Sequence, residues 1–401
     1  MTAPATFGVV PRRLPALDGI RALAVLSIMV FHTGADWFAG GGIGVDVFFV
    51  LSGFLITGLL LDEQRAAGRV RLRSFYARRA LRLLPALLLV LGFLLVWSFV
   101  GGLGAQQVDE LRRGLLFTLA YAANLQTAFL GELPPFSLTA HMWSLAIEEQ
   151  FYLVWPLVLV VLLRAGLRRR TLLVTVLVAA AASALWRAHL WDGPADVLRV
   201  YYGPDTRADP LLLGCALALV ASRRTLPRVP VLALLGGLFL VAQVRLDTHL
   251  GSFGYEGGYV LTALAAAAVL AGVVGAPDAL PARLLGTRGL VAVGTISYGL
   301  YLWHWPVFLI INAGRVDLDW LPLQVLRFVV TFAVAALSYV LLERPALRLR
   351  RRFRPGSPSQ PGAARPVASP VATPDGIVTV DPGPQDGRDV VGSSAPRTAA
   401  P

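Results

Sequence analysis

The segment that decides the fold is LPALDGIRALAVLSIMVFHT, residues 14–33. It is apolar and long enough to cross a bilayer as one helix, since a span needs about 20 residues. Arg21 and His32 are almost three helical turns apart, so their side chains share one stripe, separated by about 16 Å along the axis. Asp18 lies one turn before Arg21 and joins this stripe. Ionisable groups inside a span are costly in lipid, so the stripe predicts a protein interior or a wet cavity.

The composition points to a membrane protein. The chain has 401 residues, of which 56% are apolar and 15% charged, and the mean hydropathy is +0.65. The formal charge is +12, and arginine supplies every basic side chain because lysine is absent. These arginines lie in short loops between apolar runs, which is typical of membrane orientation, so we expect no nucleic-acid partner. The single cysteine, Cys215, excludes a disulfide framework and a thiolate metal site.

The apolar runs predict an all-α membrane protein with about ten transmembrane helices. They cover residues 14–33, 44–61, 83–101, 145–163, 171–190, 209–222, 229–246, 258–275, 289–312 and 321–342. If the ten runs cross the membrane in alternating directions from a cytoplasmic N-terminus, the arginine-rich loops all lie on the cytoplasmic side, as the positive-inside rule requires. We therefore expect a multi-pass protein of the cell membrane with both termini in the cytoplasm.

Three regions follow from this arrangement. Residues 1–13 are expected to be a cytoplasmic N-terminus and residues 14–348 the transmembrane domain. Residues 349–401 are rich in Pro, Gly, Ser, Ala and Asp without apolar periodicity, which predicts a disordered cytoplasmic tail. The stretch Gly114–Leu130 would invert every later loop if it crossed the membrane, so we predict one re-entrant or surface-lying helix there.

The first two helices bring an imidazole and a carboxylate together. A glycine-rich connection, GGGIG at residues 40–44, leads from His32 to Asp46 at the start of the second helix. A carboxylate beside an imidazole fixes its tautomer and stabilises the imidazolium, as a general base requires. The alternative is that Asp46 caps a helix and His32 is an interfacial side chain.

An arginine cluster marks the cytoplasmic start of the third helix. The sequence FYARRALRLLP places Arg78 and Arg82 one turn apart, with Arg79 beside Arg78. Guanidinium groups suit phosphate because they bind it with two parallel hydrogen bonds. Inside loops of membrane proteins are generally rich in arginine, however, so these residues could equally contact anionic lipid.

A third motif, HMWSLAIEEQFY, runs into the fourth predicted span. In a helix His141 and Glu148 share one face, and Tyr152 lies one turn further. Two adjacent carboxylates at the start of a span are hard to explain by packing. We expect Glu148 to face inward, whereas Glu149 could be a solvated cap.

Two further motifs carry candidate residues. Asp205, Arg207 and Asp209 precede the sixth span, where a helix cap with a local ion pair is at least as good an explanation as a site. In the ninth span Ser297, Tyr301 and His304 share a stripe, and we single out His304 because Tyr and Trp are common at membrane interfaces. His32, His141 and His304 do not have metal-ligand spacing on one helix, so we predict no metal site.

Together these motifs resemble the acyltransferase-3 family of polytopic membrane O-acyltransferases, over about Leu14 to Arg348. The resemblance rests on five elements in the family's order, namely Arg21 with His32, the run GVDVFFVLSGF (44–54), the Arg78, Arg79 and Arg82 cluster, the run WSLAIEEQFY (143–152), and YLWHWP (301–306). It implies transfer of an acyl group, commonly acetyl, from a cytoplasmic acyl-CoA co-substrate to a hydroxyl. The implied acceptor is a carbohydrate, a glycoconjugate or a glycosylated natural product.

On this reading the arginine cluster holds the coenzyme A phosphates and His32 acts on the acyl group. His32, oriented by Asp46 or Glu148, would deprotonate the acceptor hydroxyl or carry the acyl group briefly, and Arg21 would stabilise the thioester oxyanion. The alternative from another class is a proton-coupled or solute transporter that uses Asp18, Arg21, His32 and Glu148 as a relay. Transporters often contain inverted repeats, and we find none in this sequence.

Overall fold

The computed structural model describes residues 14–131, 137–222, 226–246 and 252–349, and within these ranges every regular element is a helix. The expected all-α fold is therefore confirmed over the described part of the chain, which belongs to one compact unit, Met1–Arg354. The predicted N-terminal region and all but the first residue of the predicted tail lie outside the described residues. The elements are α1 (Pro15–Phe31), η1 (Asp36–Ile43), α2 (Gly44–Ala67), α3 (Leu72–Val100), α4 (Ala105–Leu119), α5 (Ala123–Leu130), α6 (Met142–Arg164), α7 (Arg169–Leu190), η2 (Pro194–Asp196), α8 (Val197–Tyr202), α9 (Asp209–Ala221), α10 (Val231–Leu246), η3 (Gly254–Gly258), α11 (Tyr259–Gly275), α12 (Leu280–Leu285), α13 (Arg288–Thr295), α14 (Ser297–Ile310), α15 (Trp320–Ser338), η4 (Tyr339–Glu343) and α16 (Arg344–Leu349).

Helices form over all ten apolar runs that the sequence predicts as spans. Among the described residues, six helical stretches are long and apolar enough to cross a membrane, namely Asp36–Ala67, Leu72–Val100, Met142–Arg164, Arg169–Leu190, Gly254–Gly275 and Trp320–Leu349. These stretches indicate a multi-pass membrane protein. Membrane crossing by the four shorter segments, represented by α1, α9, α10 and the pair α13–α14, stays a prediction.

Two predicted segments are broken in the structure. The run 289–312 is interrupted at Ile296, because α13 packs along α1 whereas α14 packs mainly on α15. The stretch Gly114–Leu130 is not one helix, since α4 ends at Leu119 and α5 begins at Ala123. Between them Tyr121 has a positive φ of 52°, and the two helices pack on different partners, α4 on α3 and α5 on α6 and α8. Whether this stretch is re-entrant or surface-lying stays a prediction.

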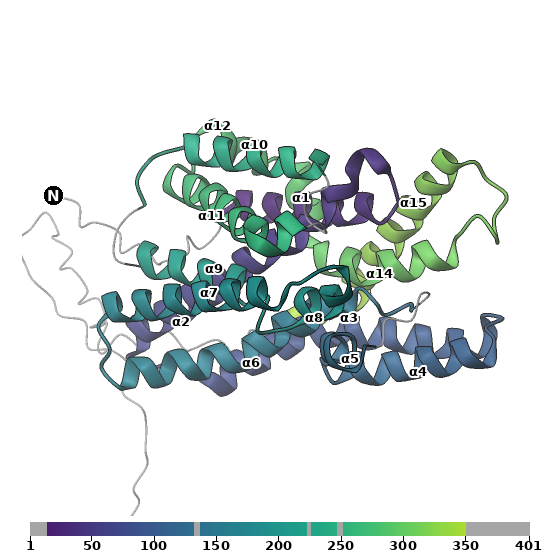
Figure 1. Cartoon of the computed structure of the whole chain (residues 1–401), viewed down its shortest axis with the longest axis horizontal. Helices are drawn as coiled ribbons and strands as arrows, with labels where there is room; N and C mark the ends of the chain where they lie inside the picture. Colours follow the sequence, from purple (N-terminus) through teal and green to yellow (C-terminus); the bar gives the residue numbers. More distant parts are fainter. Residues whose placement is uncertain (1–13, 132–136, 223–225, 247–251, 350–401) are drawn as a thin grey trace, which may run out of the picture. The chain divides into compact units, whose positions relative to one another are not determined.

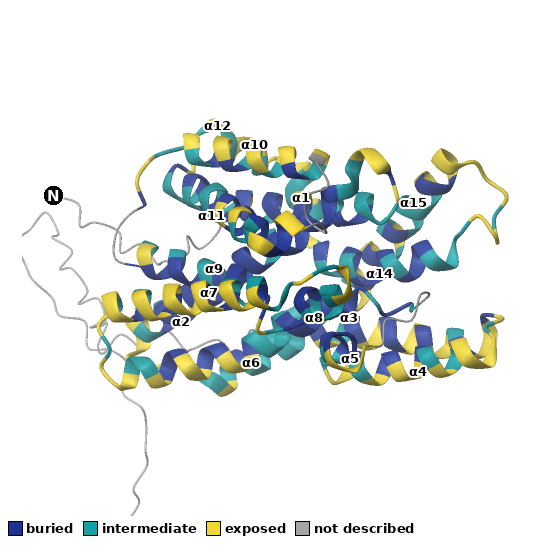
Figure 2. Ribbon diagram, viewed as in Figure 1, coloured by how far each residue is buried: buried dark blue, intermediate teal, exposed yellow. Residues whose placement is uncertain are grey.

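The interior contains two large apolar clusters that meet at α6. One is built mainly from α2, α6, α7, α9 and α11, and the other from α1, α3, α6, α14 and α15. Figure 1 shows the helices lying side by side, and Figure 2 shows exposed residues along their outward faces. On α3 those exposed residues include Leu88, Phe93, Val96 and Phe99. Large apolar side chains that face outward suit a lipid environment.

A very close helix contact joins α2 to α9 through two glycines. A Cβ built on Gly53 would lie 1.9 Å from the carbonyl oxygen of Leu211, and one on Gly214 would lie 2.1 Å from that of Val50. Both distances are far shorter than a real carbon–oxygen contact, so only glycine fits at either position. Small residues allow such backbone approach between membrane helices.

Candidate active site

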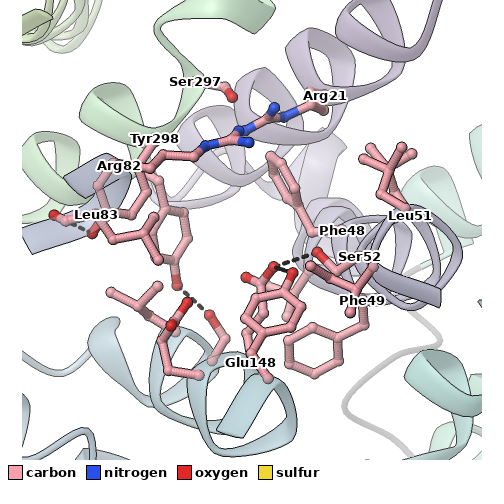
Figure 3. Close-up of a pocket in the computed structure, with 18 of the residues that line it drawn as sticks. Arg21, Phe48, Phe49, Leu51, Ser52, Arg82, Leu83, Glu148, Ser297 and Tyr298 are labelled. Carbon is pink, nitrogen blue, oxygen red and sulfur yellow. Dashed lines mark hydrogen bonds between the residues drawn. The ribbon is translucent and has the colours of Figure 1, made fainter. Parts of the chain in front are cut away.

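The main polar cavity lies between α1, α2, α3, α6 and α14 (Figure 3). Its volume is about 120 Å³, well below the roughly 300–1,000 Å³ of a pocket for a drug-sized ligand. The charged residues in its lining are Arg21, Arg79, Arg82, Glu148 and Glu149. The cavity therefore combines cationic and carboxylate groups in a space that suits a small acyl group rather than a whole nucleotide.

Two arginines from different helices converge on this cavity. Figure 3 shows the guanidinium groups of Arg21, on α1, and Arg82, on α3, reaching toward each other at one side of it. Arg21 donates no hydrogen bond to any of the described residues. Like charges brought close repel each other unless an anionic or electron-rich group lies between them. Arg21 and Arg82 thus make this side of the lining positive, and the buried carboxyl group of Glu343 nearby partly offsets that charge.

Arg79 is occupied by a carboxylate. Its Nη2 donates to Oε1 of Glu149 at 2.7 Å and its Nε donates to Oε2 at 3.2 Å. The guanidinium carbon also lies 3.1 Å from the centroid of the Tyr152 ring. Because Glu149 balances the charge of Arg79, this arginine offers less attraction to a phosphate than its place in the cluster predicts. Glu149 faces the cavity and is not a solvated cap.

Arg78 does not line the cavity. Its Nη2 donates to Oε2 of Glu63 at 3.2 Å, and its Nη1 donates to Ser74 at 2.7 Å. Arg78 and Glu63 are both buried. Arg78 and Arg79 are consecutive in α3, so their side chains point about 100° apart around the helix and reach different partners. The structure thus splits the predicted arginine cluster, with only Arg79 and Arg82 at the cavity.

Glu148 faces the cavity, as the sequence predicts, and accepts hydrogen bonds from Ser52 and Tyr152. Ser52 comes from α2, whereas Glu148 and Tyr152 are one turn apart on α6. Both carboxylates of the Glu148–Glu149 pair are therefore inward and hydrogen-bonded. The ring of His32 lies against His304 and Trp305 instead.

The hydroxyl of Tyr301 closes one side of the cavity. It lies 2.6 Å from Oγ of Ser144 and donates to the backbone oxygen of His141 at 2.5 Å. The Tyr301 ring centroid is also 5.5 Å from the ring centroids of His141 and His304. Tyr301 and Ser144 thus form a boundary between the cavity and a separate group of histidines.

Three histidines that are distant in sequence meet beyond Tyr301. Nδ1 of His32 is 2.9 Å from Nε2 of His304, and their ring centroids are 5.1 Å apart. The ring of His141 is 5.3 Å from that of His304. His32 is partly exposed, whereas His141 and His304 are buried. Trp305 packs on His32 with a centroid distance of 4.6 Å.

His141 is held neutral by its surroundings. Burial lowers the pKa of His141 well below its usual value, and the nearby rings of His304 and His32 add to this effect. Its Nε2 lies 3.2 Å from the carbonyl oxygen of Leu302, which can only accept a hydrogen bond. Across the described ranges, no group of three or more His, Cys, Asp or Glu side chains is arranged to hold a metal ion.

Asp46 does not pair with His32, contrary to the sequence prediction. Its Oδ1 accepts a hydrogen bond from Nη2 of Arg207 at 2.9 Å, and both side chains are fully buried. The guanidinium carbon of Arg207 also lies 4.0 Å from the centroid of the Tyr259 ring. The stronger attraction of a full positive charge explains this choice of partner. Asp46 therefore connects α2 to the segment before α9.

The remaining acidic candidates also form ion pairs away from the cavity. Asp209 makes two hydrogen bonds to Arg187 of α7, at 2.7 and 3.1 Å, and does not cap its own helix. Asp205 accepts from Arg199 and from the Trp186 indole. Burial opposes ionisation of Asp205, but these hydrogen bonds outweigh it and hold the pKa of this carboxyl below its usual value.

Asp18 is partly buried in the first turn of α1 and is not among the residues that line the cavity. The sequence interpretation did not single out three polar residues that line the cavity, namely Ser52, Ser144 and Tyr298, nor Arg187, which pairs with Asp209 away from it. Ser52 and Ser144 lie inside the motif runs 44–54 and 143–152, so the motifs marked their neighbourhoods. Arg187, at the end of an apolar run, was detectable as a charge within a predicted span.

Comparison with known proteins identifies the family of this chain. The family model described as an acyltransferase domain matches residues 14–342. YrhL of Bacillus subtilis, named as a candidate peptidoglycan O-acetyltransferase, is 38% identical over 352 residues, which cover 83% of this chain and 55% of YrhL. The O-acetyltransferase OatA of Staphylococcus aureus is 32% identical over 350 residues, 84% of this chain and 57% of OatA.

A third relative, the peptidoglycan O-acetyltransferase OatA of Listeria monocytogenes, is 34% identical over 347 residues, 83% of this chain and 55% of that protein. The chain thus spans a little over half the length of these relatives. No solved structure matches it significantly. The family match covers every residue of the cavity and the three clustered histidines, and the chain belongs to the acyltransferase-3 family of polytopic membrane O-acyltransferases.

Proposed function

We propose that this protein transfers an acetyl group from cytoplasmic acetyl-CoA to a hydroxyl of a carbohydrate, a glycoconjugate or a glycosylated natural product. The observation that carries this function is the small cavity in which Arg21 and Arg82 converge, one lining residue of which, Tyr301, also packs against His304 of the His32–His304 pair. The names of two relatives, YrhL of Bacillus subtilis and OatA of Listeria monocytogenes, refer to peptidoglycan O-acetylation and support a carbohydrate acceptor. No observation favours the transporter alternative.

The size and charge of the cavity suit the reactive end of the donor. A volume of about 120 Å³ accommodates an acetyl thioester, whereas the nucleotide end must remain outside it. Arg21 and Arg82 are placed to stabilise negative charge on the thioester oxygen, and positive groups fixed before the reaction lower the barrier efficiently. With both termini cytoplasmic, as the arginine bias predicts, the nucleotide approaches from the cytoplasmic ends of α2 and α3.

His32 supplies the base. It removes the proton of the acceptor hydroxyl while the hydroxyl oxygen attacks the thioester carbonyl carbon. The carbon–sulfur bond then breaks, an ester forms, and the coenzyme A thiolate takes the proton back from the imidazolium. Partial exposure of His32 allows an acceptor to approach it. For the two reactants to meet, the Tyr301–Ser144 contact must open, because it separates His32 from the cavity.

The test uses the purified full chain in lipid nanodiscs with acetyl-CoA and a chito-oligosaccharide as probe acceptor. Release of coenzyme A thiol and acetylation of the sugar, followed by mass spectrometry, are expected for the wild type. His32→Ala should lower the rate by about 10²–10⁴-fold, the usual cost of losing a general base. His189→Ala is the matched control, since His189 is exposed on α7. A folded His32→Ala protein with the wild-type rate would refute the role of His32.

A further inference from the structure

The hydrogen bonds of His304 determine its tautomer. Nδ1 of His304 lies 2.7 Å from the backbone oxygen of Tyr301 and 3.2 Å from that of Leu300. A carbonyl oxygen only accepts hydrogen bonds, so Nδ1 must carry the proton. In the neutral ring Nε2 then has a lone pair and accepts. The ring is fully buried, which leaves this arrangement shielded from water.

The proton position on His304 determines that on His32. Nε2 of His304 accepts, so Nδ1 of His32, 2.9 Å away, must donate. A neutral His32 with its proton on Nδ1 has the lone pair on Nε2. Two hydrogen bonds in series, from His32 to His304 and from His304 to Tyr301, thus select one nitrogen of His32 as the basic atom. The backbone carbonyl at the end of this series cannot reverse its polarity.

We propose that His304 is the positioning residue for His32, holding it in the tautomer whose Nε2 is the base. The partners expected from the sequence are engaged elsewhere, because Asp46 pairs with Arg207 and Glu148 accepts from Ser52 and Tyr152. A buried acceptor behind a catalytic imidazole has the same effect as the carboxylate of a hydrolase triad, where loss of the correct tautomer greatly slows the reaction. This role rests on the function proposed above.

His32 and His304 differ in solvent exposure, and this difference distinguishes the base from the residue that positions it. His32 is partly exposed, whereas His304 is 0% exposed. An acceptor sugar can therefore contact His32 but not His304. His304 also lies outside the cavity lining, so its replacement should leave donor binding unchanged. The expected signature is a lower kcat at an unchanged KM for acetyl-CoA.

Two substitutions separate the hydrogen bond from the packing. His304→Gln keeps an acceptor oxygen near the position of Nε2, whereas His304→Leu removes the acceptor and keeps a buried side chain of similar bulk. Nitrogen NMR of histidine-labelled protein in nanodiscs reports which ring nitrogen of His32 is protonated. The chain has five histidines, so the His32 signal is assigned by its loss in His32→Gln.

We expect protonated Nδ1 on His32 in the wild type and in His304→Gln, and a mixed or inverted tautomer in folded His304→Leu. The kcat of His304→Leu should fall by about 10²-fold, and that of His304→Gln by much less. If folded His304→Leu keeps the wild-type tautomer, the inference is overturned. If the wild type transfers no acetyl group yet shows the predicted tautomers, the proposed function fails while the positioning of His32 stands.

Discussion

Arg207 donates a hydrogen bond to Asp46 at 2.9 Å across 161 residues of sequence, and neither side chain is more than 1% exposed. This ion pair ties α2 to the segment that precedes α9. Nearby, Asp209 pairs with Arg187, so two buried ion pairs support the same corner of the fold. Removal of one partner leaves a buried charge without compensation, which generally costs about 3–5 kcal/mol.

Asp46→Asn is therefore expected to destabilise the protein by several kcal/mol and to lose activity through misfolding. Thermal unfolding followed by size-exclusion chromatography in detergent measures the effect. Arg207→Met in the Asp46→Leu background should recover part of the loss, because the double variant buries no lone charge. The exposed pair Arg228–Asp278 provides the control, and Asp278→Asn should unfold like the wild type. An Asp46→Asn protein that is stable but inactive would instead restore its catalytic assignment.

Arg82→Gln should lower kcat for acetyl transfer by about 10–100-fold, because negative charge on the thioester oxygen develops in the transition state and a hydrogen bond to a charged group is worth about 1.5–3 kcal/mol. Arg82 lines the cavity, whereas Arg78 pairs with Glu63 away from it. Arg78→Gln is the matched control and should lower the unfolding temperature while leaving kcat of the folded protein unchanged. Steady-state kinetics on both variants measure kcat and the KM for acetyl-CoA. An equal fall in kcat for both folded variants would return Arg78 to the donor site.

Tyr301→Phe should uncouple the donor from the acceptor. The substitution removes the hydrogen bonds to Ser144 and to the His141 backbone, so water can reach a thioester in the cavity more readily. We expect coenzyme A release without acceptor to increase several-fold and the yield of acetylated sugar per thioester consumed to fall. Tyr76→Phe, which removes a hydrogen bond to Leu153 away from the cavity, is the control. Unchanged hydrolysis in Tyr301→Phe would show that this hydroxyl forms no barrier.

Asp205 should make stability depend on acidic pH. Its pKa is lowered in the folded state, so its ionised form contributes stability at neutral pH that is lost as pH falls below about 4 and through the lowered value. Asp205→Asn should unfold at a lower temperature than the wild type near pH 7, and the difference should shrink in acid. Arg199→Gln should weaken the same dependence, since Arg199 is its ion-pair partner. A difference that persists unchanged at low pH would contradict this.

The sequence predicted the helices better than the pairing of side chains. Each of the ten predicted apolar runs is helical in the structure, because burial in lipid or protein requires long stretches of hydrophobic residues, whereas several shorter helices such as α8 and α12 were not predicted. Periodicity also placed Arg21 and Glu148 toward a polar interior, where the cavity lies. Pairing depends on tertiary contacts, however. His32 and His304 are 272 residues apart, and no local pattern shows that they meet.

The wrong predictions for Asp46 and Arg78 also arose because side-chain pairing depends on tertiary contacts. Asp46 is near His32 along the chain, and short sequence separation suggested a contact, but a guanidinium 161 residues away offers a full charge. Likewise Arg78 and Arg79 are neighbours in sequence yet point to different carboxylates, Glu63 and Glu149. The motif runs identified which stretches surround the site, and only the folded chain assigns each side chain to the cavity or to an ion pair.

The glycine contacts between α2 and α9 restrict how this protein can change shape. With no spare room at Gly53 or Gly214, neither helix can slide along the other, so the two must travel as a single rigid body. Any opening that lets an acetyl group pass Tyr301 therefore has to come from rearrangement of α1, α6 or α14 against that body. Labels placed on α14 and α2 should report this motion, whereas labels on α2 and α9 should keep a constant separation.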